Sequence, residues 1–85
     1  MQIGYLHQII PEQNAYRFYS VHIAPTLFGE WSIVYEWGRI GQPGQLRMKV
    51  FPDEHTALCA GRDQLSQKER HGYCQAVKDW PINGL

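Results

Sequence analysis

The segment YEWGRIGQPGQL, residues 35–46, brings together an aromatic ring, a guanidinium and a glycine-rich turn. Trp37 lies beside Gly38, whose lack of a side chain leaves one flank of the ring uncovered. Arg39 follows, and its guanidinium is always charged and presents a planar fork of donors. A flat ring and a charged fork on a rigid hairpin can stack on a sugar or base and hold a phosphate. These residues predict a recognition surface for nucleic acid.

The candidate surface extends into the strand after the turn, where Arg47 and Lys49 add positive charge and Glu36, before it, subtracts some. The whole chain has eight Lys and Arg and eight Asp and Glu residues, so its formal net charge is zero. Binding of duplex by bulk charge is therefore not expected, and a local patch that recognises a shape or a strand end is favoured. The predicted nucleic-acid-binding residues are Trp37, Gly38, Arg39, Arg47 and Lys49.

The turn that carries this surface is predicted from Gly41, Pro43 and Gly44. Pro43 presets φ for the second position of a type II turn, and Gly44 permits the positive φ that the third position needs. We therefore expect a positive φ at Gly44. Because Trp37 lies where the strand enters this turn, we also expect its ring to be at least partly exposed.

Two histidines and two cysteines have the composition of a zinc site. They are His55, Cys59, His71 and Cys74. A helix from about Asp53 to His71 would separate Cys59 from His71 by roughly 18 Å, at about 1.5 Å rise per residue, which is too far for ligands of one ion. No metal site and no cofactor are predicted. Two cysteines are also too few for a disulfide framework, so both are expected to be free thiols.

The sequence carries no recognisable catalytic motif. GRIGQPGQ has neither the GxGxxG nor the GxxxxGK[ST] spacing, and it precedes a strand, so no helix N-terminus faces a phosphate there. The serines lack a nucleophile-elbow signature, and no paired carboxylates stand out. We predict a protein that is not an enzyme, with no catalytic residue and no small-molecule substrate.

Strands are predicted where apolar, aromatic and β-branched residues lie between turn-forming residues. They cover 4–10, 15–24, 30–39 and 45–51, with a fifth short strand over 73–77. By the period of two, one face of the third strand carries Trp31, Ile33, Tyr35 and Trp37. In the fourth strand, the side chains predicted to face inward are Leu46, Met48 and Val50. Those predicted to face outward are Arg47 and Lys49.

A helix is predicted between the fourth and fifth strands. Asp53 is a good N-cap, cations in the last turn suit the helix dipole, and Gly72 ends the helix. Its buried stripe is Ala57, Leu58, Gly61, Leu65 and the stem of Lys68. The fold class is α+β: one domain over residues 1–85, with a small antiparallel sheet of about four to five strands and one helix packed on one face.

The chain has no run of about 18 apolar residues, so no transmembrane helix is predicted. Its N-terminus lacks the basic start and long apolar stretch of a secretion signal. We expect a cytoplasmic protein that has no membrane partner.

Residues 35–45, YEWGRIGQPGQ, resemble the signature of the WGR domain, named for its Trp-Gly-Arg triplet. The W-G-R-hydrophobic-G-x-x-G-Q run of the family matches residues 37–45, and its tyrosine-rich early strand matches NAYRFYSV. An early alanine on the helix matches Ala57, and a lysine just before Gly-Tyr matches Lys68. The resemblance covers about 14–76 and leaves a tail at 77–85. Gly61 departs from the family, in which many members carry a larger apolar residue, and predicts a shallow hollow under the helix.

The resemblance implies a small antiparallel sheet with one helix against it. In DNA-damage-activated poly(ADP-ribose) polymerases this domain helps to grip broken DNA, with the motif tryptophan near the DNA end. Carried over, Trp37 is the stacking residue and Arg39 the clamp or relay, so the expected partner is DNA at ends or nicks. The family also includes short bacterial proteins with little besides this domain, and the chain resembles these. The alternative is a protein–protein adaptor that uses the same rim, because Trp and Arg are common hot-spot residues.

Overall fold

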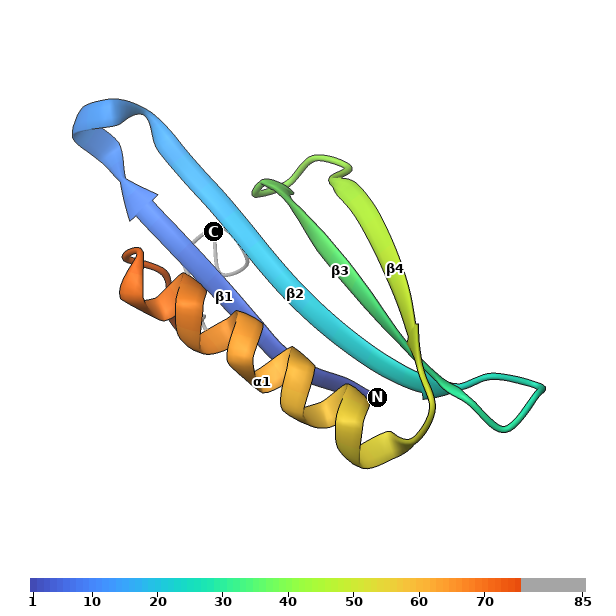
Figure 1. Cartoon of the computed structure of the whole chain (residues 1–85). Coiled ribbons are helices and arrows are strands. Elements are labelled where there is room, and N and C mark those ends of the chain that lie inside the picture. Colours follow the sequence, from blue (N-terminus) through green and yellow to red (C-terminus); the bar gives the residue numbers. More distant parts are fainter. Residues whose placement is uncertain (76–85) are drawn as a thin grey trace.

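The computed structural model describes residues 1–75. In this part of the chain, five strands form one antiparallel sheet of order β4-β3-β2-β1-β5, and one helix lies along one face (Figure 1). The strands are β1 (Gln2–Ile10), β2 (Ala15–Pro25), β3 (Trp31–Arg39), β4 (Gln45–Phe51) and β5 (Cys74–Gln75); the helix is α1 (Glu54–Arg70), and a 3₁₀ turn, η1, covers Pro11–Gln13. The predicted α+β class is confirmed. The tail at 77–85 and the end of the predicted fifth strand lie outside the described residues.

The first four strands form a meander, in which each strand pairs with its neighbour in the chain. Pro11 begins the tight connection between β1 and β2, and Asn14 completes it with a φ of 52°. β5 returns to the other edge of the sheet, where Cys74 lies opposite His7 of β1. The end of α1 is thereby fixed next to β1.

Local sequence sets both ends of α1 as predicted. The Asp53 carboxylate accepts a hydrogen bond of 2.8 Å from the backbone N–H of Thr56, which satisfies one of the free donors of the first turn. Gly72 follows the helix with a φ of 96°, a conformation that glycine adopts without strain. The helix therefore begins and ends where capping and backbone freedom allow.

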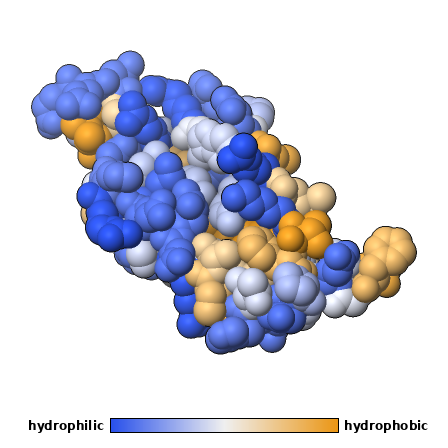
Figure 2. All heavy atoms as spheres, in the orientation of Figure 1, coloured by the Kyte–Doolittle hydropathy of each residue, from blue (hydrophilic) through white to orange (hydrophobic). Residues whose placement is uncertain are grey.

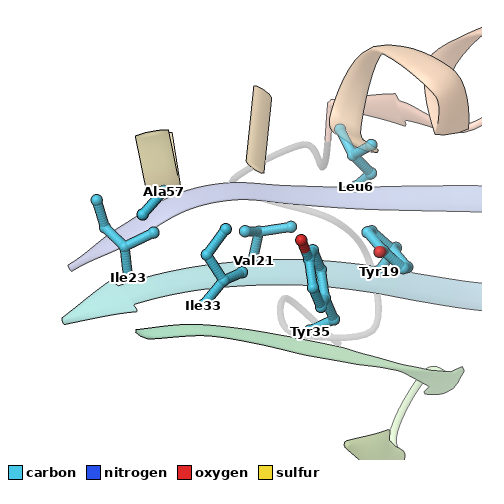
Figure 3. Close-up of a cluster of buried hydrophobic side chains, with 7 residues drawn as sticks. All are labelled: Leu6, Tyr19, Val21, Ile23, Ile33, Tyr35 and Ala57. Carbon is cyan, nitrogen blue, oxygen red and sulfur yellow. The ribbon is translucent and has the colours of Figure 1, made fainter. Parts of the chain in front are cut away.

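The core lies between the sheet and α1 (Figure 3). Its buried side chains are Leu6, Tyr19, Val21, Ile23, Ile33, Tyr35 and Ala57. The predicted inward face of β3 is confirmed, since Ile33 and Tyr35 are buried while Trp31 and Trp37 pack partly buried against the cluster. Figure 2 shows that the opposite, solvent-facing side of α1 is hydrophilic. One face of one helix and one face of the sheet thus supply the core.

Glycines allow α1 to approach β1 closely. A Cβ on Gly61 would lie 2.6 Å from Cδ1 of Ile3, and a Cβ on Gly4 would lie 2.7 Å from Cδ2 of Leu65. Ile3 and Gly4 are adjacent, yet both face the helix, because the pairing of β1 with β2 shifts register between Gln2 and Gly4. The hollow predicted at Gly61 is therefore wrong: Ile3 fills that space.

The predicted inward face of β4 is also wrong. Leu46, Met48 and Val50 are 67%, 65% and 48% exposed, and they lie on the face away from α1. Arg47 and Lys49 instead lie on the helix side, because the register of β4 against β3 places them opposite Tyr35 and Ile33. The orientation of β4 is therefore set by tertiary contacts and not by its own pattern of apolar and charged residues.

α1 does not extend over the middle of β4. An apolar side chain that faced inward there would have no apolar layer to pack against. Long side chains with apolar stems and charged heads suit such a half-covered position.

The predicted type II turn is wrong as well. Among the turn glycines, Gly41 has the positive φ, at 85°, and Gly44 does not. Gly44 is required for another reason: a Cβ there would overlap the carbonyl oxygen of Trp37 and lie 2.8 Å from Cζ of Phe18. The glycine is therefore needed for close packing of the hairpin and not for its backbone angle.

We expect Gly44→Val to destabilise the fold by about 1–3 kcal/mol, the usual cost of overpacking. Thermal unfolding followed by circular dichroism measures the loss. Gln42→Val is the control, because Gln42 lies in the same turn and is exposed. Equal melting temperatures for Gly44→Val and the parent would contradict the close packing.

Alkaline pH is expected to destabilise the fold through Tyr19. Burial raises the pKa of Tyr19 from 10.0 to about 12, so the unfolded chain ionises first. This contribution to stability is complete below about pH 10 and is lost as the pH rises to about 12. Denaturant titrations across that range should show a shallower fall in the free energy of unfolding for Tyr19→Phe than for the parent. Equal slopes would disprove the role of Tyr19.

Candidate nucleic-acid interface

Trp37 lies near the end of β3, on the face that carries the core. It packs on Tyr19, its partner across β2 and β3, with ring centroids 6.5 Å apart and an angle of 29° between the rings. Trp37 is neither buried nor fully exposed, so its predicted partial exposure is confirmed. The ring is anchored on Tyr19 and remains partly exposed.

Gly38, the next residue in β3, allows the close backbone packing next to Trp37. It lies opposite Phe18 in β2, and a Cβ at Gly38 would lie 2.9 Å from Cα of Gly44. The backbone at Gly38 and Gly44 is therefore in close contact where the hairpin closes, beside the buried Phe18 ring. Gly38 fixes the path of the chain next to Trp37.

Arg39 uses its guanidinium fork on the β1–β2 connection. Nη1 donates a hydrogen bond of 3.1 Å to the backbone oxygen of Asn14, and Nη2 donates one of 3.3 Å to its side-chain oxygen. The guanidinium carbon also lies 5.3 Å from the centroid of the Tyr16 ring. Arg39 stays exposed, and three of its five N–H donors remain for a further partner.

A first hollow of about 220 Å³ opens between α1 and the β3–β4 side of the sheet. Its lining is aromatic and basic: Tyr19, Tyr35, Trp37, Arg47, Lys49, Gln64 and Lys68. Lys68 reaches over from α1, with Nζ 4.9 Å from the centroid of Tyr19. Burial raises the pKa of both Tyr19 and Tyr35, so these phenols are neutral near pH 7.

A second hollow of about 300 Å³ adjoins the first at Trp37. It is lined by Asn14, Ala15, Tyr16, Arg17, Trp37, Gly38, Arg39 and Tyr73. Arg17 and Arg39 lie directly opposite each other on β2 and β3, an arrangement of like charges that destabilises a sheet. Arg17 is partly held by a 2.9 Å hydrogen bond from its Nη1 to Gln8.

The two hollows concentrate the positive charge of a neutral chain. Five of the eight Lys and Arg residues line them, and within residues 1–75 no Asp or Glu does. All five predicted site residues line one or both hollows, and Gly38 also follows Trp37 directly in the chain. The structure adds Arg17 and Lys68, which the sequence analysis did not assign to the site.

Signals for both added residues were present in the sequence. Arg17 alternates in phase with Tyr19 and Val21 on β2, and Lys68 continues the buried stripe of α1 through Leu65. Placing them at the hollows also requires the register of the sheet and the position of the helix.

The two histidines and two cysteines, for which the sequence predicts no metal site, do not converge. Nε2 of His55 lies 3.6 Å from Sγ of Cys59 on the exposed side of α1, whereas Cys74 lies on β5. In the part of the chain that the structure describes, no three His, Cys, Asp or Glu side chains form a metal cluster. Cys59 and Cys74 are both free and exposed. No described helix is long and apolar enough to cross a membrane.

One relative is an uncharacterized protein, y4dW, from Sinorhizobium fredii (strain NBRC 101917 / NGR234). It is 38% identical over 69 residues, which are 81% of this chain and 34% of the relative. The chain thus spans about a third of the length of this relative. No solved structure matches the chain.

The sequence model of the WGR domain matches residues 3–79. The match includes β1, which lies before the stretch that carries the resemblance in the sequence, and β1 supplies Ile3, Gly4 and Leu6 to the contact with α1. Because the match covers nearly all of its 85 residues, the chain belongs to the WGR domain family.

Proposed function

We propose that this protein is a non-enzymatic module that binds nucleic acid and grips DNA at ends or nicks through the surface around Trp37. WGR domains are a family of nucleic-acid-binding modules, which supports the broader part of the proposal. The finer part rests on one observation: five of the eight cations of a chain of zero net charge line the two hollows that meet at the partly exposed Trp37.

The charge distribution favours phosphate as one component of the ligand. Arg17 and Arg39 face each other at a cost to the sheet. Arg47 and Lys49 lie on the same face of β4, and among residues 1–75 no acidic side chain lines their hollow. A bound polyanion offsets this repulsion and releases counterions as it binds. Phosphates spaced along a strand match cations distributed over two adjoining hollows.

The size of the hollows favours a segment of a polymer over a free small molecule. Pockets for drug-sized ligands occupy about 300–1,000 Å³, and these two hollows lie below or at the lower limit of that range. Each suits one sugar, base or phosphate of a longer strand. No small-molecule substrate is therefore part of the proposal.

Trp37 favours an end or a nick over intact duplex. Inside a duplex the bases are stacked on both sides, so a protein ring finds a free flat face only where the stack is interrupted. A base or sugar on Trp37 contributes about 1–3 kcal/mol by alanine substitution. The packing on Tyr19 holds the ring in place before the ligand arrives.

The first test is a titration of the full chain with blunt, nicked and intact circular duplexes at two salt concentrations. We expect the blunt and nicked forms to bind more tightly than the circle, and affinity to fall as salt rises. Equal affinity for all three would contradict end recognition. Absence of binding to every form at about 100 μM protein and low salt would contradict nucleic-acid binding, since non-specific affinities are about 10⁻⁴–10⁻⁶ M, and would favour the adaptor alternative.

The second test separates stacking from phosphate contacts. Trp37→Ala should weaken end binding by about 1–3 kcal/mol at both salt concentrations. Arg47→Gln should instead flatten the slope of log affinity against log salt by about one unit. Arg39→Lys should recover only part of the loss in Arg39→Ala, because an ammonium lacks the bidentate fork.

Arg70→Ala is the matched control, because Arg70 is exposed near the end of α1 and lines neither hollow. It should bind as the parent does. Melting curves establish that each variant is folded. A loss for Arg70→Ala as large as that for Arg47→Gln would mean that the cations act through overall charge and that the hollows are not the site.

A further inference from the structure

β4 forms one edge of the sheet. It pairs with β3 along its length, and in the described part of the chain no strand pairs with its other side. Such an edge presents a row of backbone N–H and C=O groups that can accept another strand. β4 offers seven residues for this purpose, whereas β5, at the opposite edge, has two.

The two faces of β4 differ sharply in chemistry. On the face away from α1, Leu46, Met48 and Val50 form an exposed apolar row. On the other face, Arg47 and Lys49 carry positive charge. Proteins usually protect an edge strand with charges, and here the protection covers one face only.

A second copy of the chain does not suit this edge. Side chains alternate between faces, so any pairing that joins the apolar rows of two copies also joins their cationic rows. In an antiparallel pair centred on Met48, Arg47 of each copy would lie opposite Lys49 of the other. Like charges directly opposite destabilise a strand pair.

We propose that the β4 edge binds an extended segment of a partner protein in which apolar residues alternate with Asp or Glu. Backbone hydrogen bonds along the edge supply affinity, and the alternating side chains supply specificity, as in other cases of strand addition. The partner's apolar residues extend the row of Leu46, Met48 and Val50. Its carboxylates lie beside Arg47 and Lys49, which also makes the segment a competitor for the cations of the first hollow.

The test uses a labelled, end-blocked peptide, Val-Glu-Val-Glu-Val-Glu-Val, with fluorescence anisotropy on the full chain. Two control peptides isolate the chemistry: one has Lys in place of every Glu, and the other has the same composition in two blocks, without alternation. We expect the alternating acidic peptide to bind and both controls to fail. Amide hydrogen exchange should slow in 45–51 when it binds.

Charge reversal in the chain gives the sharper result. The double variant Arg47→Glu with Lys49→Glu should weaken binding of the acidic peptide about tenfold or more and gain binding of the lysine peptide, since like-charge contacts across an interface are strongly unfavourable. Binding of the acidic peptide that survives this reversal would overturn the proposal.

The apolar row is tested by Met48→Gln, which should weaken binding of the alternating acidic peptide. Leu27→Gln is the matched control, because Leu27 is 97% exposed on the connection between β2 and β3, away from the edge, where Figure 2 shows a projecting hydrophobic tip. Equal losses for the two variants would overturn the proposal. So would a concentration-dependent dimer that Met48→Gln abolishes, because the edge would then belong to a second copy.

Discussion

The width of one helix against five strands is the constraint on which the rest of this structure depends. With side chains, an α-helix measures about 10–12 Å across, whereas five strands at intervals of about 4.7–4.9 Å span roughly 19 Å. α1 therefore cannot cover the sheet. The fully buried residues of the core cluster come from β1, β2, β3 and α1, and none comes from β4.

The uncovered strip over β3 and β4 is where the aromatic and basic side chains collect. Tyr35 is buried at the margin of the core and borders the first hollow, and Trp37 is only partly covered. Arg47 and Lys49 place charged heads where no apolar layer exists to be disrupted. The incomplete cover by α1 thus leaves a partly desolvated surface, where rings and cations interact more strongly with a ligand than at a fully exposed site.

Local signals in the sequence were sufficient for the elements of this fold. Alternation and turn residues located the strands, while Asp53 and Gly72 located the ends of α1. The face of β4 was not predictable in this way: its alternation of apolar and charged residues is typical of a strand with its apolar side buried. Whether a second layer extends over a strand depends on the width and placement of α1, which no window of β4 contains. Gly44 is similar, since its constraint comes from how tightly the hairpin closes on the Trp37 carbonyl and from Phe18, far away in the chain.

The residues of the candidate site likewise fall into those that local sequence located and those that only the tertiary fold brings to the site. Trp37, Arg47 and Lys49 come from one hairpin, so short-range reasoning brought them together. Arg17 and Lys68 join them only through the pairing of β2 with β3 and the position of α1 over the sheet. The contact of Arg39 with Asn14 likewise joins residues 25 positions apart, and a signature motif gives no indication of it.

The interlocking of β1 and α1 has a consequence for how this domain diversifies. Ile3 fills the space over Gly61, and Leu65 fills the space over Gly4, so each layer lends volume to the other. A larger residue at one of these positions therefore displaces the end of the side chain that it meets on the other layer. In a family member with a larger residue at the position of Gly61, the residue at the position of Ile3 is expected to turn aside or be smaller, so that the two positions covary.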